Sequence, residues 1–182
     1  MSRTGPEDID PTRIDIEFDP TVRRMIGVAY HGNKHFNVPF MSPIVDNLWT
    51  GGCQSGLILP EEIDHVVSLY PWEEYSASRP LHSKLAVRMY DSTDEAVNSE
   101  QVWQIAAWVN SCRSNGVTLV HCQAGLNRSN LIAAAALILD GVEPHEALAL
   151  LREKRSHAVL CNPLFEEWVL NASPPRMIVH HD

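Results

Sequence analysis

A cysteine and an arginine flank a short loop at the junction between an apolar run and a helical pattern, and five residues separate Cys122 from Arg128. A loop of this kind can turn its backbone N–H groups inward and, with the N-terminus of the helix, form an anion site. Gly125 permits the positive φ that such a curl needs. The same field favours a cysteine thiolate, which is a strong nucleophile, and the planar guanidinium of Arg128 can hold two phosphoryl oxygens. The loop therefore predicts nucleophilic attack on a phosphate ester.

Ser129 directly follows the arginine. Its hydroxyl can donate a hydrogen bond toward the sulfur, which makes the sulfur a better leaving group when a thiophosphate breaks. The plainer interpretation treats Cys122 as a small buried hydrophobic residue and Arg128 as an ordinary residue of a first helical turn. Because cations are disfavoured at a helix N-terminus, the arginine is better explained by an anion beside it.

The surrounding sequence predicts the elements that position this loop. A strand is predicted over 117–120 and a helix over about 127–139, which Gly141 ends. Further strands are predicted over 45–50, 65–70 and 85–90, and further helices over 99–114, 144–154 and 162–170. A short helix is predicted to begin at Pro60, residues 31–43 are predicted to be irregular, and Ile14, Ile16 and Phe18 alternate like a short strand. Strands that alternate with helices predict an α/β domain, with a central and mainly parallel sheet flanked by helices. Ligands of such sheets usually bind at the carboxyl ends of the strands.

The segment from His121 to Ser129 resembles the signature H-C-x-x-G-x-x-R-[ST] of the protein tyrosine phosphatase superfamily. Its HCQAG form is most similar to the dual-specificity branch. Segments 47–53, 65–69 and 162–165 resemble the same branch. The resemblance spans 44–171, which is expected to be a dual-specificity phosphatase catalytic domain. Residues 1–43 are then an acidic N-terminal arm and lead-in, and residues 172–182 a C-terminal tail.

The resemblance implies a protein-tyrosine-phosphatase-like fold and a two-step reaction through a phosphocysteine, with no metal or other cofactor. Cys122 is then the nucleophile, while His121 and Asn162 support the loop. The phosphate-binding positions are Gln123, Ala124, Gly125, Leu126, Asn127 and Arg128. Asn130 stands where many relatives carry glycine, and it is expected to affect helix packing more than chemistry.

The resemblance also places a general acid, which protonates the leaving oxygen, between a strand and the helix that leads to the signature loop. Asp91 and Asp94 both lie in that segment. Asp91 is preferred because it directly follows the predicted strand, and Asp94 is the alternative. The plainer interpretation is that either aspartate caps a turn.

The composition disfavours some classes of binding partner and predicts the cellular compartment. The formal net charge is −9, from 14 basic and 23 acidic residues, so attraction to nucleic acid or to an anionic membrane is disfavoured. The sequence contains no run of about 18 apolar residues, so no membrane span is expected. The N-terminus lacks the apolar segment of a signal peptide. The four cysteines show no metal or disulfide spacing, so reduced thiols and a cytoplasmic location are expected. The sequence leaves the oligomeric state open.

A phosphoprotein is the expected substrate. None of the side chains at 123–127 is basic, which disfavours inositol phosphates, and the chain lacks the insertions that deepen the pocket of tyrosine-specific relatives. Phosphotyrosine and phosphoserine/threonine are therefore both expected. Two alternatives stay open. Asn127 before Arg128 resembles the G-x-N-R loop of RNA 5′-triphosphatases of the same superfamily, and the domain could instead bind phosphoproteins without turnover.

Overall fold

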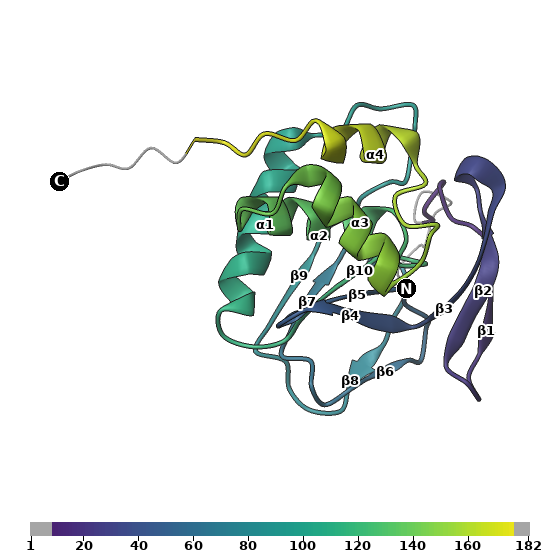
Figure 1. Ribbon diagram of the computed structural model, residues 1–182. Coiled ribbons are helices and arrows are strands. Elements are labelled where there is room, and N and C mark those ends of the chain that lie inside the picture. Colours follow the sequence, from purple (N-terminus) through teal and green to yellow (C-terminus); the bar gives the residue numbers. More distant parts are fainter. Residues whose placement is uncertain (1–8, 177–182) are drawn as a thin grey trace, which may run out of the picture.

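The computed structural model describes residues 9–176, and Figure 1 shows its α-helices gathered on one side of a sheet. The strands are β1 (Ile16–Asp19), β2 (Arg24–Ala29), β3 (Lys34–Pro39), β4 (Met41–Val45), β5 (Leu48–Gly51), β6 (Ile58–Leu59), β7 (His65–Ser68), β8 (Ser76–Ala77), β9 (Ser83–Ala86) and β10 (Thr118–His121). The helices are the short 3-10 helix η1 (His31–Asn33), α1 (Ser99–Arg113), α2 (Arg128–Leu139), α3 (Pro144–Lys154) and α4 (Pro163–Leu170).

The central sheet has five strands in the order β4-β5-β10-β7-β9. Strand β4 runs antiparallel to β5, and the other neighbours are parallel. This arrangement confirms the predicted α/β class with a mainly parallel sheet. It also confirms the strand before the signature loop and the helix after it.

The two middle strands, β7 and β10, are buried along their whole length. Successive side chains of a strand point to opposite faces, so Val67 and Val120 pack into the core under the helices, whereas Val66 and Leu119 pack into a smaller cluster on the other face. A strand that is covered on both faces of the sheet has a continuous run of apolar residues in its sequence. That burial is why these strands were recognisable in the sequence.

Helix α2 is buried from Arg128 to Ile138. It packs against β10 and against the three other α-helices, and its four consecutive alanines allow the neighbouring elements to come close. Because neighbours enclose it, α2 is apolar on all sides rather than along one stripe. The helix that carries the predicted arginine is therefore fixed in the centre of the domain.

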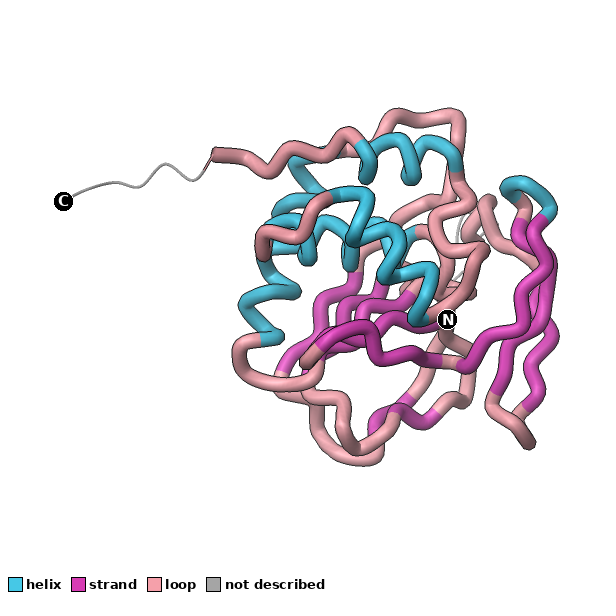
Figure 2. The backbone as a smooth tube through the Cα atoms, viewed as in Figure 1, coloured by secondary structure: helices cyan, strands magenta, loops and turns pink. Residues whose placement is uncertain are grey.

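A second sheet, β1-β2-β3, is antiparallel and stands at the edge of the domain (Figure 2). The prediction that residues 31–43 are irregular was wrong, because they contain β3 and most of β4. Phe36, Val38 and Phe40 are buried in alternation with more exposed neighbours. Pro39 obscured this strand pattern, although proline is tolerated in an edge strand such as β3.

Three other predicted elements differ from the structure. The strand predicted over 45–50 is interrupted by a turn at 46–47, with Asn47 at φ 61°, and β5 begins only at Leu48. The helix predicted at Pro60 is a turn closed by Ile63 N donating to Pro60 O, since the chain re-enters a strand at His65 and leaves no room for a helix. The strand predicted over 85–90 lies at 83–86. Within residues 9–176, no helix has the length and apolar character needed to cross a membrane.

Candidate active site

The signature loop, residues 122–127, connects the carboxyl end of β10 to the first turn of α2. Parallel neighbours hold the strand in register, with His121 opposite Gly51 of β5 and Ser68 of β7. Cys122 N donates to Gly51 O at 3.1 Å. The thiol therefore lies at the carboxyl edge of the sheet, and the residue is only 2% exposed.

The carbonyl groups of the signature loop are bound on its outer side. At one end the carbonyl of Gln123 accepts a hydrogen bond from Cys53 N at 3.1 Å, and at the other end the carbonyl of Leu126 accepts one from Leu160 N at 2.9 Å. Both donors come from elements packed outside the loop. The two ends of the loop are thus held with their carbonyls turned outward.

Arg155, just after α3, binds the middle of the loop in the same way. Its Nη2 donates to Ala124 O at 2.9 Å and its Nε donates to Gly125 O at 2.6 Å. Because each peptide unit is planar and trans, a carbonyl that points outward turns the following N–H inward. The N–H groups of residues 124–127 therefore face the centre of the loop, where they form a cradle for an anion.

Gly125 has the positive φ that the sequence predicted, at +70°. A Cβ at this position would lie 2.4 Å from the carbonyl carbon of Gly51 and 2.6 Å from Arg155 Nη2. Any side chain would therefore push the loop away from both groups that hold it. Glycine is needed here for its conformation and for the close approach of the backbone.

Replacing Arg155 by methionine is expected to lower the free energy of unfolding by about 3 kcal/mol, because buried acceptors would lose their donor. Besides the two loop carbonyls, Arg155 Nη1 donates to Pro39 O at 2.9 Å and to Ser42 Oγ at 3.0 Å. Urea denaturation measures the change. Arg152→Met is the matched control, since Arg152 lies half-exposed in the last turn of α3 and its ion pair with Glu166 is partly exposed. Equal losses in the two variants would contradict the special role of Arg155.

Asn130 contributes to the loop, contrary to the expectation that it mainly affects helix packing. Its Nδ2 donates to Gly125 O at 2.8 Å and to Leu126 O at 3.2 Å, and lies 3.4 Å from Ser129 Oγ. These contacts come from inside the first turn of α2. They help to keep the same carbonyls away from the anion cradle, which a glycine at this position could not do.

Arg128 is buried in the cavity that also contains Cys122. Its Nη1 donates to Met89 O at 2.9 Å and lies 2.7 Å from Asp10 Oδ2. The guanidinium carbon lies 5.1 Å from the centre of the Tyr70 ring. Burial lowers the pKa of Arg128, but the charges of Cys122, Asp10 and Asp91 outweigh it and raise the pKa, so the group stays cationic.

Asp91 faces this cavity from the loop after β9. Its Oδ1 accepts from Asn162 Nδ2 at 2.8 Å and lies 3.1 Å from His31 Nε2, while its Oδ2 accepts from Asn127 Nδ2 at 2.9 Å. Burial raises the pKa of Asp91, but the hydrogen bonds from His31 and Asn162 and the charge of Arg128 together lower it below its ordinary value. Asp91 is the aspartate that the structure brings to the signature loop.

Asp94, the alternative acid, lies on the exposed side of the same segment. Its N–H donates to Ser92 Oγ at 3.0 Å, in a local turn. It lines a hollow together with Asp91 but not the cavity that contains Cys122 and Arg128. Its position fits the plainer interpretation of a turn residue.

Ser129 and His121 lie on either side of the thiol. Cys122 Sγ and Ser129 Oγ are 3.4 Å apart, within hydrogen-bonding distance when sulfur is involved. The two ring nitrogens of His121 contact Cys122 O and the hydroxyl of Tyr75. Burial lowers the pKa of His121 to about 4, so at neutral pH the ring is uncharged and helps to fix the strand end.

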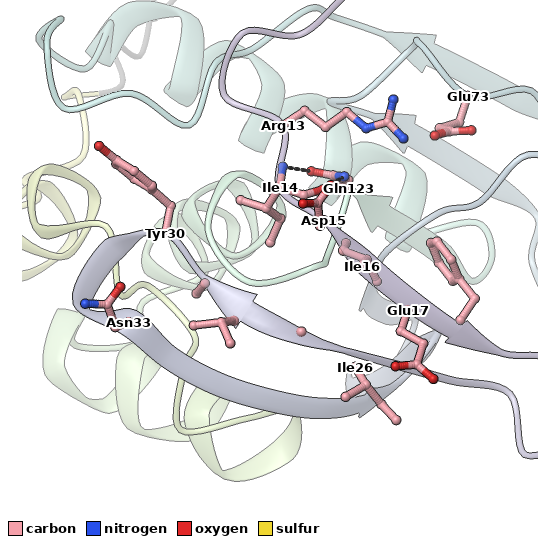
Figure 3. Close-up of a pocket in the computed structure, with 14 residues that line it drawn as sticks. Arg13, Ile14, Asp15, Ile16, Glu17, Ile26, Tyr30, Asn33, Glu73 and Gln123 are labelled. Carbon is pink, nitrogen blue, oxygen red and sulfur yellow. Dashed lines mark hydrogen bonds between the residues drawn. The ribbon is translucent and has the colours of Figure 1, made fainter.

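Two of the predicted phosphate-binding residues turn their side chains elsewhere. Gln123 exchanges hydrogen bonds with the backbone of Ile14, as Figure 3 shows, and Asn127 binds Asp91 and accepts a hydrogen bond from Asn162 N at 2.9 Å. Of the predicted phosphate-binding positions, the backbone N–H groups of the loop and the guanidinium of Arg128 remain as donors that could bind an anion.

No motif in the sequence pointed to three residues that shape this site, namely Asp10, His31 and Arg155. They contact Arg128, Asp91 and the loop carbonyls from positions 118, 60 and 30 residues away. Each is a common polar residue in a segment without a motif. Only the folded chain reveals what they contact.

Residues 59–173, more than half of the chain, match the family model of the dual specificity phosphatase catalytic domain. Over 53 residues the chain is 36% identical to "Probable protein tyrosine phosphatase type IVA B" of Dictyostelium discoideum, which covers 29% of this chain and 32% of that protein. Over 61 residues it is 36% identical to "Cyclin-dependent kinase inhibitor 3" of Rattus norvegicus, which covers 32% of this chain and 29% of that protein. The matched part is thus about a third of the length of these curated relatives.

The fold is similar to that of solved structures. Human DUSP28 has a TM-score of 0.57 at 18% identity, covering 72% of this chain and 90% of that chain. The human tyrosine phosphatase-like serine/threonine/tyrosine-interacting protein has a TM-score of 0.56 at 18% identity, covering 71% of this chain and 92% of that chain. At these identities the similarity concerns the fold alone. The match of residues 59–173 to the family model shows that the chain belongs to the dual specificity phosphatase family of the cysteine-based protein tyrosine phosphatase superfamily.

Proposed function

We propose that this chain is a metal-independent phosphatase that hydrolyses phosphotyrosine and phosphoserine/threonine on proteins through a phosphocysteine. One observation carries the proposal: Cys122, Arg128 and Asp91 line the same cavity, beneath a loop whose carbonyls are bound on its outer side. A nucleophile, an anion clamp and a proton donor are the three groups that phosphoryl transfer to a thiol requires.

In the first step the Cys122 thiolate attacks phosphorus, so that an S–P bond forms and the ester P–O bond breaks. Arg128 and the inward N–H groups hold the non-reacting oxygens as charge spreads over them, and Asp91 gives its proton to the leaving oxygen. In the second step water attacks phosphorus and gives a proton to the Asp91 carboxylate. The S–P bond breaks, and Ser129 donates a hydrogen bond to the departing sulfur.

The loop chemistry supports a phosphoprotein over an inositol phosphate. Several phosphate groups on one ring call for several cations, but residues 123–127 carry none. The side chains of Gln123 and Asn127 are also engaged with Ile14 and Asp91. A single phosphate on an otherwise weakly charged partner suits this site best.

The test is hydrolysis of phosphotyrosine and phosphothreonine peptides in the presence of EDTA and a thiol reductant. Both peptides are expected to release phosphate. Acid quenching during turnover, followed by peptide mapping, is expected to find a phosphoryl group on Cys122. Hydrolysis of the phosphotyrosine peptide alone would overturn the dual specificity, and phosphate release that stops with EDTA would overturn the metal-independent reaction.

The two alternatives have less support. The contacts of Asn127 with Asp91 and Asn162 give this residue a positioning role. An RNA substrate is therefore not needed to explain why asparagine precedes Arg128, as it does in the loop of RNA triphosphatases. A phosphoprotein-binding module does not need a proton donor, yet Asp91 lies in the cavity. Release of γ-phosphate from RNA ends, or tight peptide binding without turnover, would favour these alternatives instead.

A further inference from the structure

A segment of the chain itself lies in the candidate active site. Residues 9–14, here called the strap, precede β1 and fall outside the matched family domain. Asp10 Oδ2 lies 2.7 Å from Arg128 Nη1, and the side chain of Asp10 has no exposed surface. A carboxylate of the same chain thus binds the guanidinium that the proposed reaction needs for the phosphoryl group.

A turn fixes the direction of this carboxylate. The backbone N and Oγ1 of Thr12 donate to Asp10 Oδ1 at 2.8 and 2.7 Å, and Arg13 N donates to Asp10 O at 3.2 Å. Aspartate commonly closes such turns through its own side chain. Here one carboxylate oxygen closes the turn, which leaves the other to reach Arg128.

Further hydrogen bonds hold the strap to both sides of the cavity. Asp91 N donates to Thr12 Oγ1 at 2.9 Å, which connects the strap to the loop of the proposed acid. Ile14 N donates to Gln123 Oε1 at 3.0 Å, and Gln123 Nε2 donates to Ile14 O at 2.7 Å, which connects it to the signature loop. Figure 3 shows Ile14 and Gln123 facing each other at this position. The strap is therefore bound to the two loops that carry the chemistry.

The strap leaves no room for a substrate. The cavity beside Cys122 and Arg128 measures about 20 Å³; since a single water needs about 10–15 Å³ of such space, the cavity has room for little more than one water molecule. Thr12 and Ile14 line it together with Cys122. A phosphate ester can reach the thiol only after the strap has moved.

Asp10 is nevertheless an incomplete partner for Arg128. The buried Nε of Arg128 has no hydrogen-bond partner in the part of the chain that the structure describes, and Asp10 engages only Nη1. A phosphoryl group offers three oxygens and can bind two donors of a guanidinium at once, in addition to the inward N–H groups. A phosphate can therefore compete with Asp10 for the site.

We propose that the strap is an autoinhibitory element, in which the Asp10 carboxylate takes the place of the substrate phosphate until a phosphorylated substrate displaces it. The inference rests on the proposed function, because inhibition has meaning only if the site turns over. The strap closes the site in the free protein, and its departure opens the path to Cys122.

Asp10→Asn in the full chain removes the charge but keeps the shape of the side chain. With para-nitrophenyl phosphate, kcat/KM is expected to rise about tenfold, because a larger fraction of molecules is open. Asp15→Asn is the matched control, since Asp15 is exposed and lies five positions further along the chain; it is expected to leave kcat/KM unchanged. Thr12→Ala removes the hydroxyl that binds Asp91 N and one of the two hydrogen bonds from Thr12 to Asp10 Oδ1; because Asp10 keeps its charge, this variant is expected to raise kcat/KM by a smaller factor.

A second readout separates the strap from the proposed function. The rate at which iodoacetamide alkylates Cys122, followed by peptide mapping, is expected to rise about tenfold in Asp10→Asn and to stay unchanged in Asp15→Asn. Faster alkylation of Asp10→Asn without phosphate release in any variant would support the strap as a cover of the site and would overturn the proposed phosphatase activity. Unchanged alkylation and unchanged kcat/KM in Asp10→Asn would overturn the strap. A lower kcat without faster alkylation would also overturn it, because Asp10 would then position Arg128 for the reaction.

Discussion

Cys122→Ser is expected to lower the rate of phosphate release by at least roughly a thousandfold, because a hydroxyl is a far weaker nucleophile than a thiolate. The two titratable neighbours that could act as a base on the serine are already held by other groups. The ring nitrogens of His121 already contact Cys122 O and Tyr75, and Asp91 is bound by His31, Asn127 and Asn162. Steady-state hydrolysis of para-nitrophenyl phosphate measures the loss.

The matched control for this change is Cys112→Ser. Cys112 is also a buried free thiol, but it lies on α1 with its sulfur 3.7 Å from Ser83 Oγ, far from the signature loop in the fold. It is expected to retain the rate of the unaltered protein. Inorganic phosphate should still bind to Cys122→Ser, because the inward N–H groups and Arg128 are unchanged. Substantial turnover by Cys122→Ser would refute a cysteine nucleophile.

The parts of the site that could be predicted are those that the local sequence encodes. Strand β10, the signature loop and α2 follow one another between residues 118 and 139. Burial on both faces makes β10 apolar, a tight curl requires Gly125, and enclosure by neighbouring helices makes α2 apolar on all sides. Each of these constraints leaves a pattern within a few residues, so Cys122 and Arg128 could be located without a structure.

The parts that could not be predicted depend on pairing between distant segments. Arg155 stabilises the loop from 30 residues away, and Asp10 reaches Arg128 from 118 residues away. A lone arginine near the end of a helix, or an aspartate in an acidic arm, has many ordinary explanations on a surface. Strand β3 of the N-terminal sheet was missed for a related reason, since Pro39 and the turn at Gly32 interrupt an alternation that only pairing with β2 makes clear.

Asp91→Asn is expected to lower kcat by about 10²–10⁴ for substrates with a poor leaving group, which is the usual contribution of a general acid. A phosphothreonine peptide has such a leaving group, because its alkoxide must be protonated as it departs. Para-nitrophenolate departs without a proton, so the same variant should lose much less activity toward para-nitrophenyl phosphate. The ratio of the two losses is the measurement. Asp94→Asn is the control and should affect neither substrate.

The dependence of kcat on pH gives an independent test of the same residue. An acid must be protonated to act, and the hydrogen bonds from His31 and Asn162 with the charge of Arg128 lower the pKa of Asp91 despite its burial. The protonated fraction therefore falls as pH rises, and kcat for the phosphothreonine peptide should fall with it. A bound phosphate dianion offsets the charge of Arg128, which raises the pKa of Asp91 in the complex. The alkaline decline should be absent in Asp91→Asn.

A change at His31 is expected to shift the fall of kcat to a different pH without abolishing it. Its Nε2 lies 3.1 Å from Asp91 Oδ1, and this hydrogen bond is the largest of the influences that lower the pKa of Asp91. His31→Leu removes the donor, so the pKa of Asp91 should rise and the decline of kcat should shift to higher pH. His35→Leu, at an exposed position on β3, should leave the profile in place. If His31→Leu lowers kcat without moving the profile, His31 supports the fold of the N-terminal sheet and does not set the protonation of Asp91.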